Sequence, residues 1–147
     1  MAITAGQSKA IFFTSAHRQL GLNVEGGYFL GTSGGGVAFI VAPVATEASN
    51  VTWGNQTAVT NAEAAIPCGD WFIPNLTDLL NPGYENKSAW DGGTAPTGRY
   101  WSSTCCGGFS FDNPNTGPQY VYMTNGCNGS CYSTELYLAR AFRCVTY

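Results

Sequence analysis

Charged side chains are scarce in this chain of 147 residues. Only 10% of the residues are Asp, Glu, Lys or Arg, against roughly 25% in an average soluble domain. The six Lys and Arg residues and the net charge of −3 argue against nucleic-acid binding, because phosphate contacts need clustered cations. The same shortage excludes a basic helix on a membrane surface. Asn, Thr, Ser and Gly must therefore form most of the solvent-exposed surface.

Long apolar runs are missing as well. No segment approaches the roughly 20 apolar residues of a membrane span, and the run at residues 11–13 is too short for the apolar part of a secretory signal. Six cysteines nevertheless occur, an even number that in a secreted chain predicts three disulfides. A chain made without a leader that ends in an oxidising place fits a virion protein released by lysis. A removed leader or reduced cysteines remain the open alternatives.

The residues that enzymes and metal sites need are sparse or isolated. His17 is the only histidine, so a nucleophilic Ser102, Ser103 or cysteine would depend on a base far away in the sequence. The nine carboxylates are scattered. The pair Cys105-Cys106 and the spacing of Cys127 and Cys131 suit tetrahedral zinc poorly. We therefore expect no enzymatic activity, no cofactor and no metal.

Residues 71–80 are the stretch around which the chain is organised. Trp71 is expected to be a buried anchor, and Pro74 ends one segment just before a helix begins. Asn75 or Thr77 can cap that helix by accepting a backbone N–H, and Asp78 falls in the first turn, where the helix dipole favours a carboxylate. Three leucines at i, i+3 and i+4 form one apolar face that needs a core: Leu76, Leu79 and Leu80.

The rest of the chain predicts mostly β structure, with turn-forming Gly, Pro and Asn between the segments. We expect strands at residues 26–31, 36–43, 99–104, 119–124 and 135–147, the last of them central, and a short helix at residues 57–66. Loops are expected at residues 45–55, 81–98 and 125–133. Residues 1–20, with a candidate strand at 10–15, form an arm that docks on a neighbouring subunit, and residues 21–147 form one domain.

Six short motifs follow one another in a recognisable order. They are Gly26-Gly27 through Ala42-Pro43, Trp53-Gly54, Trp71-Phe72-Ile73-Pro74, Asp78-Leu79, Tyr100-Trp101-Ser102-Ser103-Thr104 and Phe142-Arg143-Cys144-Val145. In this order and spacing the chain resembles the Lcl C-terminal-like domains of the C-type-lectin-like superfamily, over about residues 20–147. Ile73, Asp78 and Phe142 depart from the Leu, Glu and Val usual in those domains.

The resemblance implies an α+β, C-type-lectin-like fold with mostly antiparallel strands, two short helices, many loops and stabilising disulfides. Such domains are non-enzymatic and occur in phage virion or tail-fibre proteins and on bacterial surfaces. We therefore expect a structural or decoration protein of a bacteriophage virion that contacts other virion subunits as a homo-oligomer or symmetric array. The alternative is a receptor-binding tail fibre or a bacterial surface adhesin that recognises a host glycan or protein.

The resemblance also implies a nested disulfide pattern. In it Cys68 bonds Cys144, and the pair Cys105-Cys106 is tied to the loop that holds Cys127 and Cys131. The structural anchors implied are Trp71, Pro74, Trp101 and Phe142. Arg140 and Arg143 should point to opposite faces of the last strand, one buried against a carbonyl or Asp78 and the other exposed.

The expected binding face comes from the loops after Trp101, at residues 109–117 and 125–133. Its candidate residues are Phe109, Asp112, Asn113, Asn115, Tyr120, Tyr122, Asn125, Asn128 and Tyr132. The tyrosines would be rigid amphipathic contacts, although packing under a neighbouring loop or subunit is an equal alternative. Asn113-Pro114-Asn115 resembles part of a lectin calcium loop, but the later Trp-Asn-Asp has no counterpart and calcium prefers several carboxylates, so a simple turn is favoured.

Overall fold

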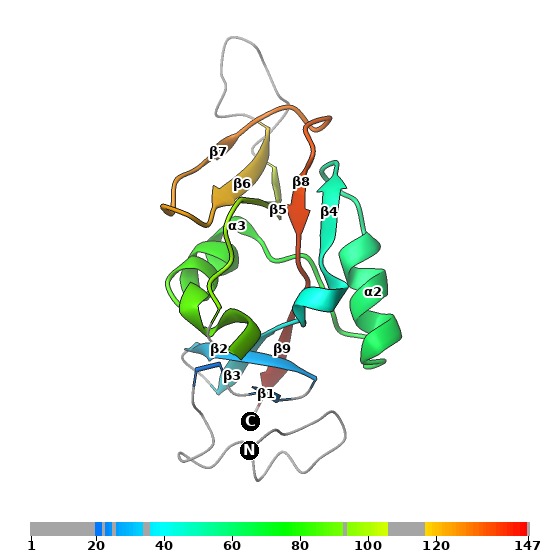
Figure 1. The fold of residues 1–147 in the computed structure, drawn as a ribbon, viewed down its shortest axis with the longest axis vertical. Helices are drawn as coiled ribbons and strands as arrows, with labels where there is room; N and C mark the ends of the chain where they lie inside the picture. Colours follow the sequence, from blue (N-terminus) through cyan, green and yellow to red (C-terminus); the bar gives the residue numbers. More distant parts are fainter. Residues whose placement is uncertain are drawn as a thin grey trace.

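The computed structural model describes residues 20–21, 23–24, 26–33, 36–92, 94–105 and 117–146. It is an α+β structure in which two sheets lie one above the other, with the helices beside and between them (Figure 1). The expected α+β class with mostly antiparallel strands and two short helices is confirmed. Several predicted features lie outside the described residues, namely the strand at 10–15, His17, Cys106, Phe109, Asp112, Asn113 and Asn115.

The four-stranded sheet has the order β1-β2-β3-β9 and is antiparallel throughout. Its strands are β1 (Asn23–Val24), β2 (Gly27–Ser33), β3 (Val37–Val41) and β9 (Phe142–Thr146). The predicted hairpin of β2 and β3 is confirmed. A bulge interrupts its register between Phe29 and Gly31, and Gly31 there adopts φ of 128°, a conformation open almost only to glycine.

The five-stranded sheet has the order β4-β8-β5-β6-β7. Its strands are β4 (Ala48–Val51), β8 (Tyr137–Ala139), β5 (Arg99–Cys105), β6 (Pro118–Tyr122) and β7 (Asn128–Ser130). Only the β5–β8 pair is parallel. Strands were predicted for β5 and β6, whereas β4 and β7 were wrongly predicted as loop. Both missed strands are short and rich in Asn, Ser and Gly, which is the composition of a turn.

The predicted helix at 57–66 is confirmed as α2 (Thr57–Ala65). The second helix, α3 (Leu76–Asp78), begins as expected, because the Asn75 side chain accepts the backbone N–H of Asp78 at 2.8 Å. It continues into the helical turns η3 (Leu79–Tyr84) and η4 (Lys87–Gly92), so the loop predicted at 81–98 is partly wrong. A further 3-10 turn, η2 (Val44–Thr46), precedes β4.

The closing segment differs most from its prediction. Residues 135–147 were expected to form one long central strand, but the chain bends at Arg140 and Ala141 and divides between the sheets. The part before the bend, β8, lies between β4 and β5, whereas β9 lies at the end of the four-stranded sheet beside β3. The two halves thus join the sheets to each other (Figure 1).

The main core lies between the two sheets. It contains Leu30, Phe39, Leu79, Trp90 and Phe142, and the predicted leucine face of α3 and η3 packs against it. A second cluster covers the other face of the four-stranded sheet, where α2 and Trp71 pack on β3 and β9. A small third cluster joins α2 to β4 and β8 through Ala48, Ala58 and Ala139. The residues expected to be anchors, Trp71, Pro74, Trp101 and Phe142, are all buried.

The expected bond between Cys68 and Cys144 is not present, and in the described part of the chain Cys68, Cys127, Cys131 and Cys144 are free thiols. Cys68 packs with the second cluster and Cys144 with the main core, so the two thiols lie on opposite faces of one sheet. Cys105 and Cys131 both lie opposite Pro118, which separates them by two strand spacings, roughly 9.5 Å. That exceeds the Cα separation of about 7 Å that a disulfide spans.

The two arginines of the closing segment also differ from the prediction, since both are buried, at 2% and 7% exposure. Arg143 donates to Asp70 at 2.6 Å rather than to Asp78. Arg140 lies at the bend, where it bonds the carbonyl of Ala42 and two carboxylates. An exposed arginine was expected because the closing segment was taken for a single strand with one solvent face.

Candidate binding surface

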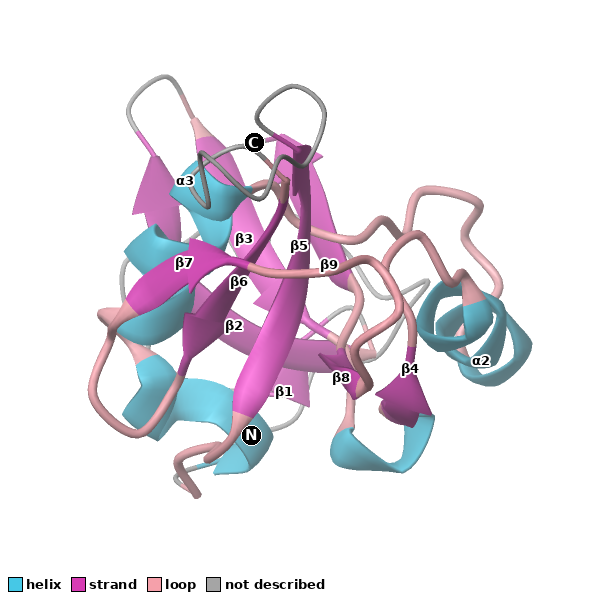
Figure 2. Cartoon of the chain, turned by 90° about the horizontal axis from the view of Figure 1, so that it is seen from above, coloured by secondary structure: helices cyan, strands magenta, loops and turns pink. Residues whose placement is uncertain are grey.

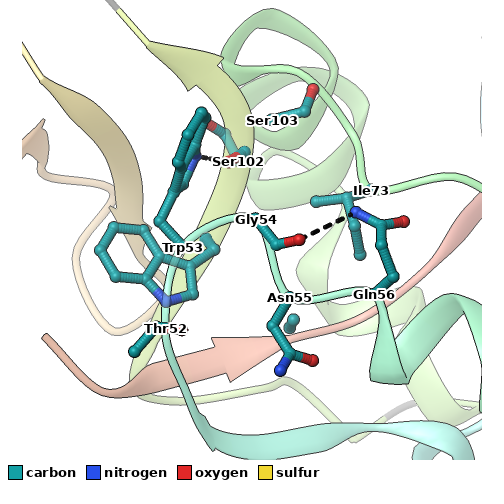
Figure 3. Close-up of a pocket in the computed structure, with 10 residues that line it drawn as sticks. Thr52, Trp53, Gly54, Asn55, Gln56, Ile73, Ser102 and Ser103 are labelled. Carbon is teal, nitrogen blue, oxygen red and sulfur yellow. Dashed lines mark hydrogen bonds between the residues drawn. The ribbon is translucent and has the colours of Figure 1, made fainter. Parts of the chain in front are cut away.

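A small pocket opens beside the five-stranded sheet. It has a volume of about 220 Å³ and lies between the loop that follows β4 and the middle of β5. Its lining residues are Thr52, Trp53, Gly54, Asn55, Gln56, Ile73, Trp101, Ser102, Ser103 and Ala139 (Figure 3). None of these residues is charged, so the pocket suits an uncharged group.

Two indole rings line this pocket, and their N–H groups are already used. The indole N–H of Trp53 donates to the carbonyl of Ser102 at 2.9 Å, and that of Trp101 donates to the carbonyl of Val51 at 2.8 Å. These bonds tie the loop after β4 to β5 from both sides. Because the donors are occupied, the rings offer a ligand apolar surface rather than hydrogen bonds. Ile73 and Ala139 extend the apolar lining.

Neutral polar groups surround the rim. Asn55 accepts the backbone N–H of Thr57 at 2.8 Å, at the start of α2, and the Gln56 amide reaches the carbonyl of Gly54 at 3.4 Å. The hydroxyls of Thr52 and Ser103 belong to exposed residues. The rim can therefore form a few hydrogen bonds, while the pocket itself is mostly apolar.

An aromatic row continues from the pocket across the sheet, and we define it as Trp101, Tyr120, Tyr122 and Tyr137. Trp101 pairs with Tyr120 across β5 and β6. The Tyr137 ring on β8 lies 4.7 Å from that of Trp101 and 5.2 Å from that of Tyr120. Neighbours on these strands, such as Tyr100, face the main core instead. The row is therefore on the outer face of the sheet.

The helix α2 covers only part of this outer face. It packs on β4 and β8 and lies away from β6 and β7 (Figure 2). None of the core clusters within the described ranges contains a ring of the row. The three tyrosines are half-buried, so each ring keeps a solvent-facing part.

Arg99 lies beside the row and brings a positive charge to it. It is exposed and pairs with Tyr122 across β5 and β6. Its guanidinium lies 4.7 Å from the centroid of Tyr122 and 5.9 Å from those of Tyr120 and Tyr137. Such stacking holds the planar group without using its N–H donors. Among the described residues no carboxylate forms an ion pair with Arg99.

Cys131 directly follows β7, and its thiol lies next to the hydroxyl of Tyr137. Its side chain is hydrogen-bonded to the Tyr137 hydroxyl. Burial raises the pKa of Tyr137 above its ordinary value, and the bond to Cys131 adds to that shift. Tyr137 therefore stays protonated and neutral at physiological pH.

The structure brings only some of the predicted binding residues together. Tyr120 and Tyr122 lie in the row, whereas Asn125 accepts the backbone N–H of Cys127 and holds a turn. Asn128 and Tyr132 are exposed near the β7 end. Sequence reasoning missed Trp53, Arg99 and Tyr137 as surface contributors. For Arg99 a signal existed, because Arg99 and Trp101 must share a face at a spacing of two in a strand.

No protein-family model matches this chain, and no curated protein matches its sequence. The described part of the chain holds no group of three or more His, Cys, Asp or Glu side chains that could bind a metal ion. None of the helices in that part has the length and apolar character that a membrane crossing requires.

Proposed function

We propose that this chain is a non-enzymatic structural or decoration protein of a bacteriophage virion, built on a C-type-lectin-like domain. Its domain contacts another subunit of the particle through the aromatic row and the adjoining pocket. The observation that carries the proposal is the row of half-exposed tyrosine rings beside a pocket on the outer face of the five-stranded sheet. The six ordered motifs support the choice of the fold family and of the virion setting.

Aromatic side chains suit an interface. Tyr and Trp supply large, rigid contact area and are enriched where proteins bind one another. Here they lie beside a pocket and are held by hydrogen bonds and ring contacts, as with the indole of Trp53. Little ordering of these side chains is then needed on binding, which favours affinity. A face of this kind left in solvent favours association.

A receptor-binding role is the second candidate. The solvent-facing tyrosine rings and the hydroxyls at the pocket rim would also suit a host-surface glycan, because a sugar stacks its apolar face on an aromatic ring. This version predicts few copies per particle and saturable binding to host cells. The structural version predicts many symmetry-related copies.

Quantitative mass spectrometry of purified particles separates the two versions through the copy number of the chain. We expect a high, symmetry-related number, and absence of the chain from every particle would overturn both virion versions. The surface is tested with Tyr122→Ala, which should reduce incorporation into particles. Val44→Ser is the matched control, because Val44 is also an exposed apolar residue but belongs to η2, outside the row and pocket.

A further inference from the structure

Resting on the proposed function, we infer that the ligand of this surface is an extended polypeptide segment of a partner protein. The segment inserts one apolar side chain into the pocket and places a carboxylate on Arg99. The apolar side chain is inferred from the uncharged pocket lined by indole rings. The carboxylate is inferred from the exposed Arg99 on the tyrosine rings.

The pocket selects an apolar group. Its volume of about 220 Å³ fits one side chain rather than an oligomeric ligand. Both indole N–H groups are bonded to backbone carbonyls. The side-chain oxygen of Asn55 already accepts the backbone N–H of Thr57 at the start of α2. A sugar buried here would leave most of its hydroxyls without partners, which costs free energy for each one. An aromatic or aliphatic side chain has no such requirement.

Arg99 selects the second group. The tyrosine rings hold its guanidinium in place, and its N–H donors point to no carboxylate among residues 20–146 that the structure describes. A preorganised guanidinium matches a carboxylate through two parallel hydrogen bonds. Charge complementarity therefore points to an acidic residue in the partner, even though this chain is itself acidic with a net charge of −3.

The register sets the spacing between the two contacts. Arg99 and Trp101 lie on one side of β5 at a spacing of two residues, and the pocket residues Ser102 and Ser103 follow past an irregularity in the register of that strand. Each such step rises about 6.6 Å, so the centre of the pocket lies roughly 7–13 Å from Arg99. An extended peptide covers the same distance in two to four residues. The partner therefore carries its acidic residue two to four positions from its apolar anchor.

The test uses the full chain labelled with ¹⁵N and four probes. The first is the blocked pentapeptide Gly-Phe-Gly-Asp-Gly. The second replaces its Asp by Asn, the third replaces its Phe by Ser, and the fourth is methyl α-D-glucopyranoside. Signals of the indole N–H groups of Trp53 and Trp101 report on the pocket, and the Nε–H signal of Arg99 reports on the cation.

We expect the Phe-Asp peptide to shift all three signals in a saturable way. The Asn peptide should bind about three- to tenfold more weakly, as expected for loss of one partly exposed charge-assisted contact. The Ser peptide should leave the indole signals unmoved. In Arg99→Gln the Asp and Asn peptides should bind equally, whereas Val44→Ser should behave as the unaltered chain.

Three results would overturn the inference. One is a persisting preference for Asp in Arg99→Gln, which would remove the role of the cation. Another is a response of the indole signals to the glucoside but not to the Phe-Asp peptide. In that case the surface still binds, and the proposed function stands in its receptor-binding form. The third is no response to any probe, and the proposed function then fails as well if Tyr122→Ala enters particles normally.

Discussion

Replacing Arg140 by Met tests the account of the bend between β8 and β9. The Arg140 side chain is only 2% exposed, and its two carboxylate partners, Glu47 and Asp91, are 17% and 15% exposed. The guanidinium donates to Glu47 at 2.6 and 3.0 Å and to Asp91 at 3.0 Å. It also lies 5.2 Å from the Trp90 ring. Methionine fills much of the same space but leaves both carboxylates without their cation.

The expected loss of stability is large. Burial opposes the charge of Arg140, but the neighbouring carboxylates of Glu47 and Asp91 outweigh it and raise the pKa of the guanidinium. Removing one partner of such a buried group typically costs about 3–5 kcal/mol. For a domain of this size each kcal/mol lowers Tm by roughly 2–4 °C, so Arg140→Met should lower Tm by about 6–20 °C. Calorimetry and urea unfolding, monitored by Trp fluorescence, measure both quantities.

The control distinguishes unpaired charge from lost packing. The triple variant Arg140→Met, Glu47→Gln, Asp91→Asn removes the uncompensated carboxylates as well as the cation, and should recover a large part of the loss. Tyr100 would keep a partner, because its hydroxyl donates to Glu47 at 2.6 Å and an amide oxygen still accepts. A loss of stability below about 1 kcal/mol for Arg140→Met, or no recovery in the triple variant, would show that buried carboxylates without a cation do not destabilise the domain as expected.

Three further results are expected. Trp71→Ala should destabilise the domain by roughly 3–5 kcal/mol, since Trp71 is 6% exposed and packs on β3 and β9; a variant that stays as stable but loses binding would make Trp71 a contact residue. Asn75→Ala should cost about 1 kcal/mol in urea unfolding, through loss of the helix cap, and an unchanged midpoint would contradict that role. Burial and the hydrogen bond to Asp70 raise the pKa of Cys68 to about 11. At pH 8 iodoacetamide should therefore label the exposed Cys127 before Cys68, and the labelling of Cys68 should accelerate toward pH 11. Equal labelling rates of the two thiols at pH 8 would count against this environment of Cys68.

The sequence predicted the parts of the fold that depend on local signals. The hairpin of β2 and β3 follows from alternating apolar residues around a glycine turn. The start of α3 follows from the ability of Asn75 to accept an orphan N–H. Both signals lie within a few neighbouring residues, so they could be recognised without knowledge of the partners in space.

Features that depend on distant partners were not predicted. The strand β4 is polar and forms because β8 lies beside it, with Ala48 opposite Ala139. The bend at Arg140 depends on Glu47 and Asp91, which are 93 and 49 residues away. In the sequence the same residues read as one continuous apolar strand. Long-range pairing of this kind overrides local propensity.

Only part of the candidate surface was predicted, because the rest of it depends on strands that pair over a long distance in the sequence. Tyr120 and Tyr122 alternate along one strand, and this pattern indicates a shared face. Tyr137 joins that face from β8, which pairs in parallel with β5, and no local pattern predicts that pairing. The loops at residues 109–117 and 125–133 were favoured instead because loops commonly carry function.

The bend at Arg140 connects the stability of the domain to its binding surface. Tyr137, Leu138 and Ala139 alternate between the outer and inner faces of β8, so a slip of one residue would move Tyr137 into the core. Arg140 follows directly and is held by Glu47, which follows η2, by Asp91 of η4 and by the Ala42 carbonyl just after β3, the last at 3.0 Å. These contacts fix where β8 ends. Arg140 therefore helps to hold the register that places Tyr137 against Trp101, so the stability of the domain and the order of its aromatic row depend on the same buried cation.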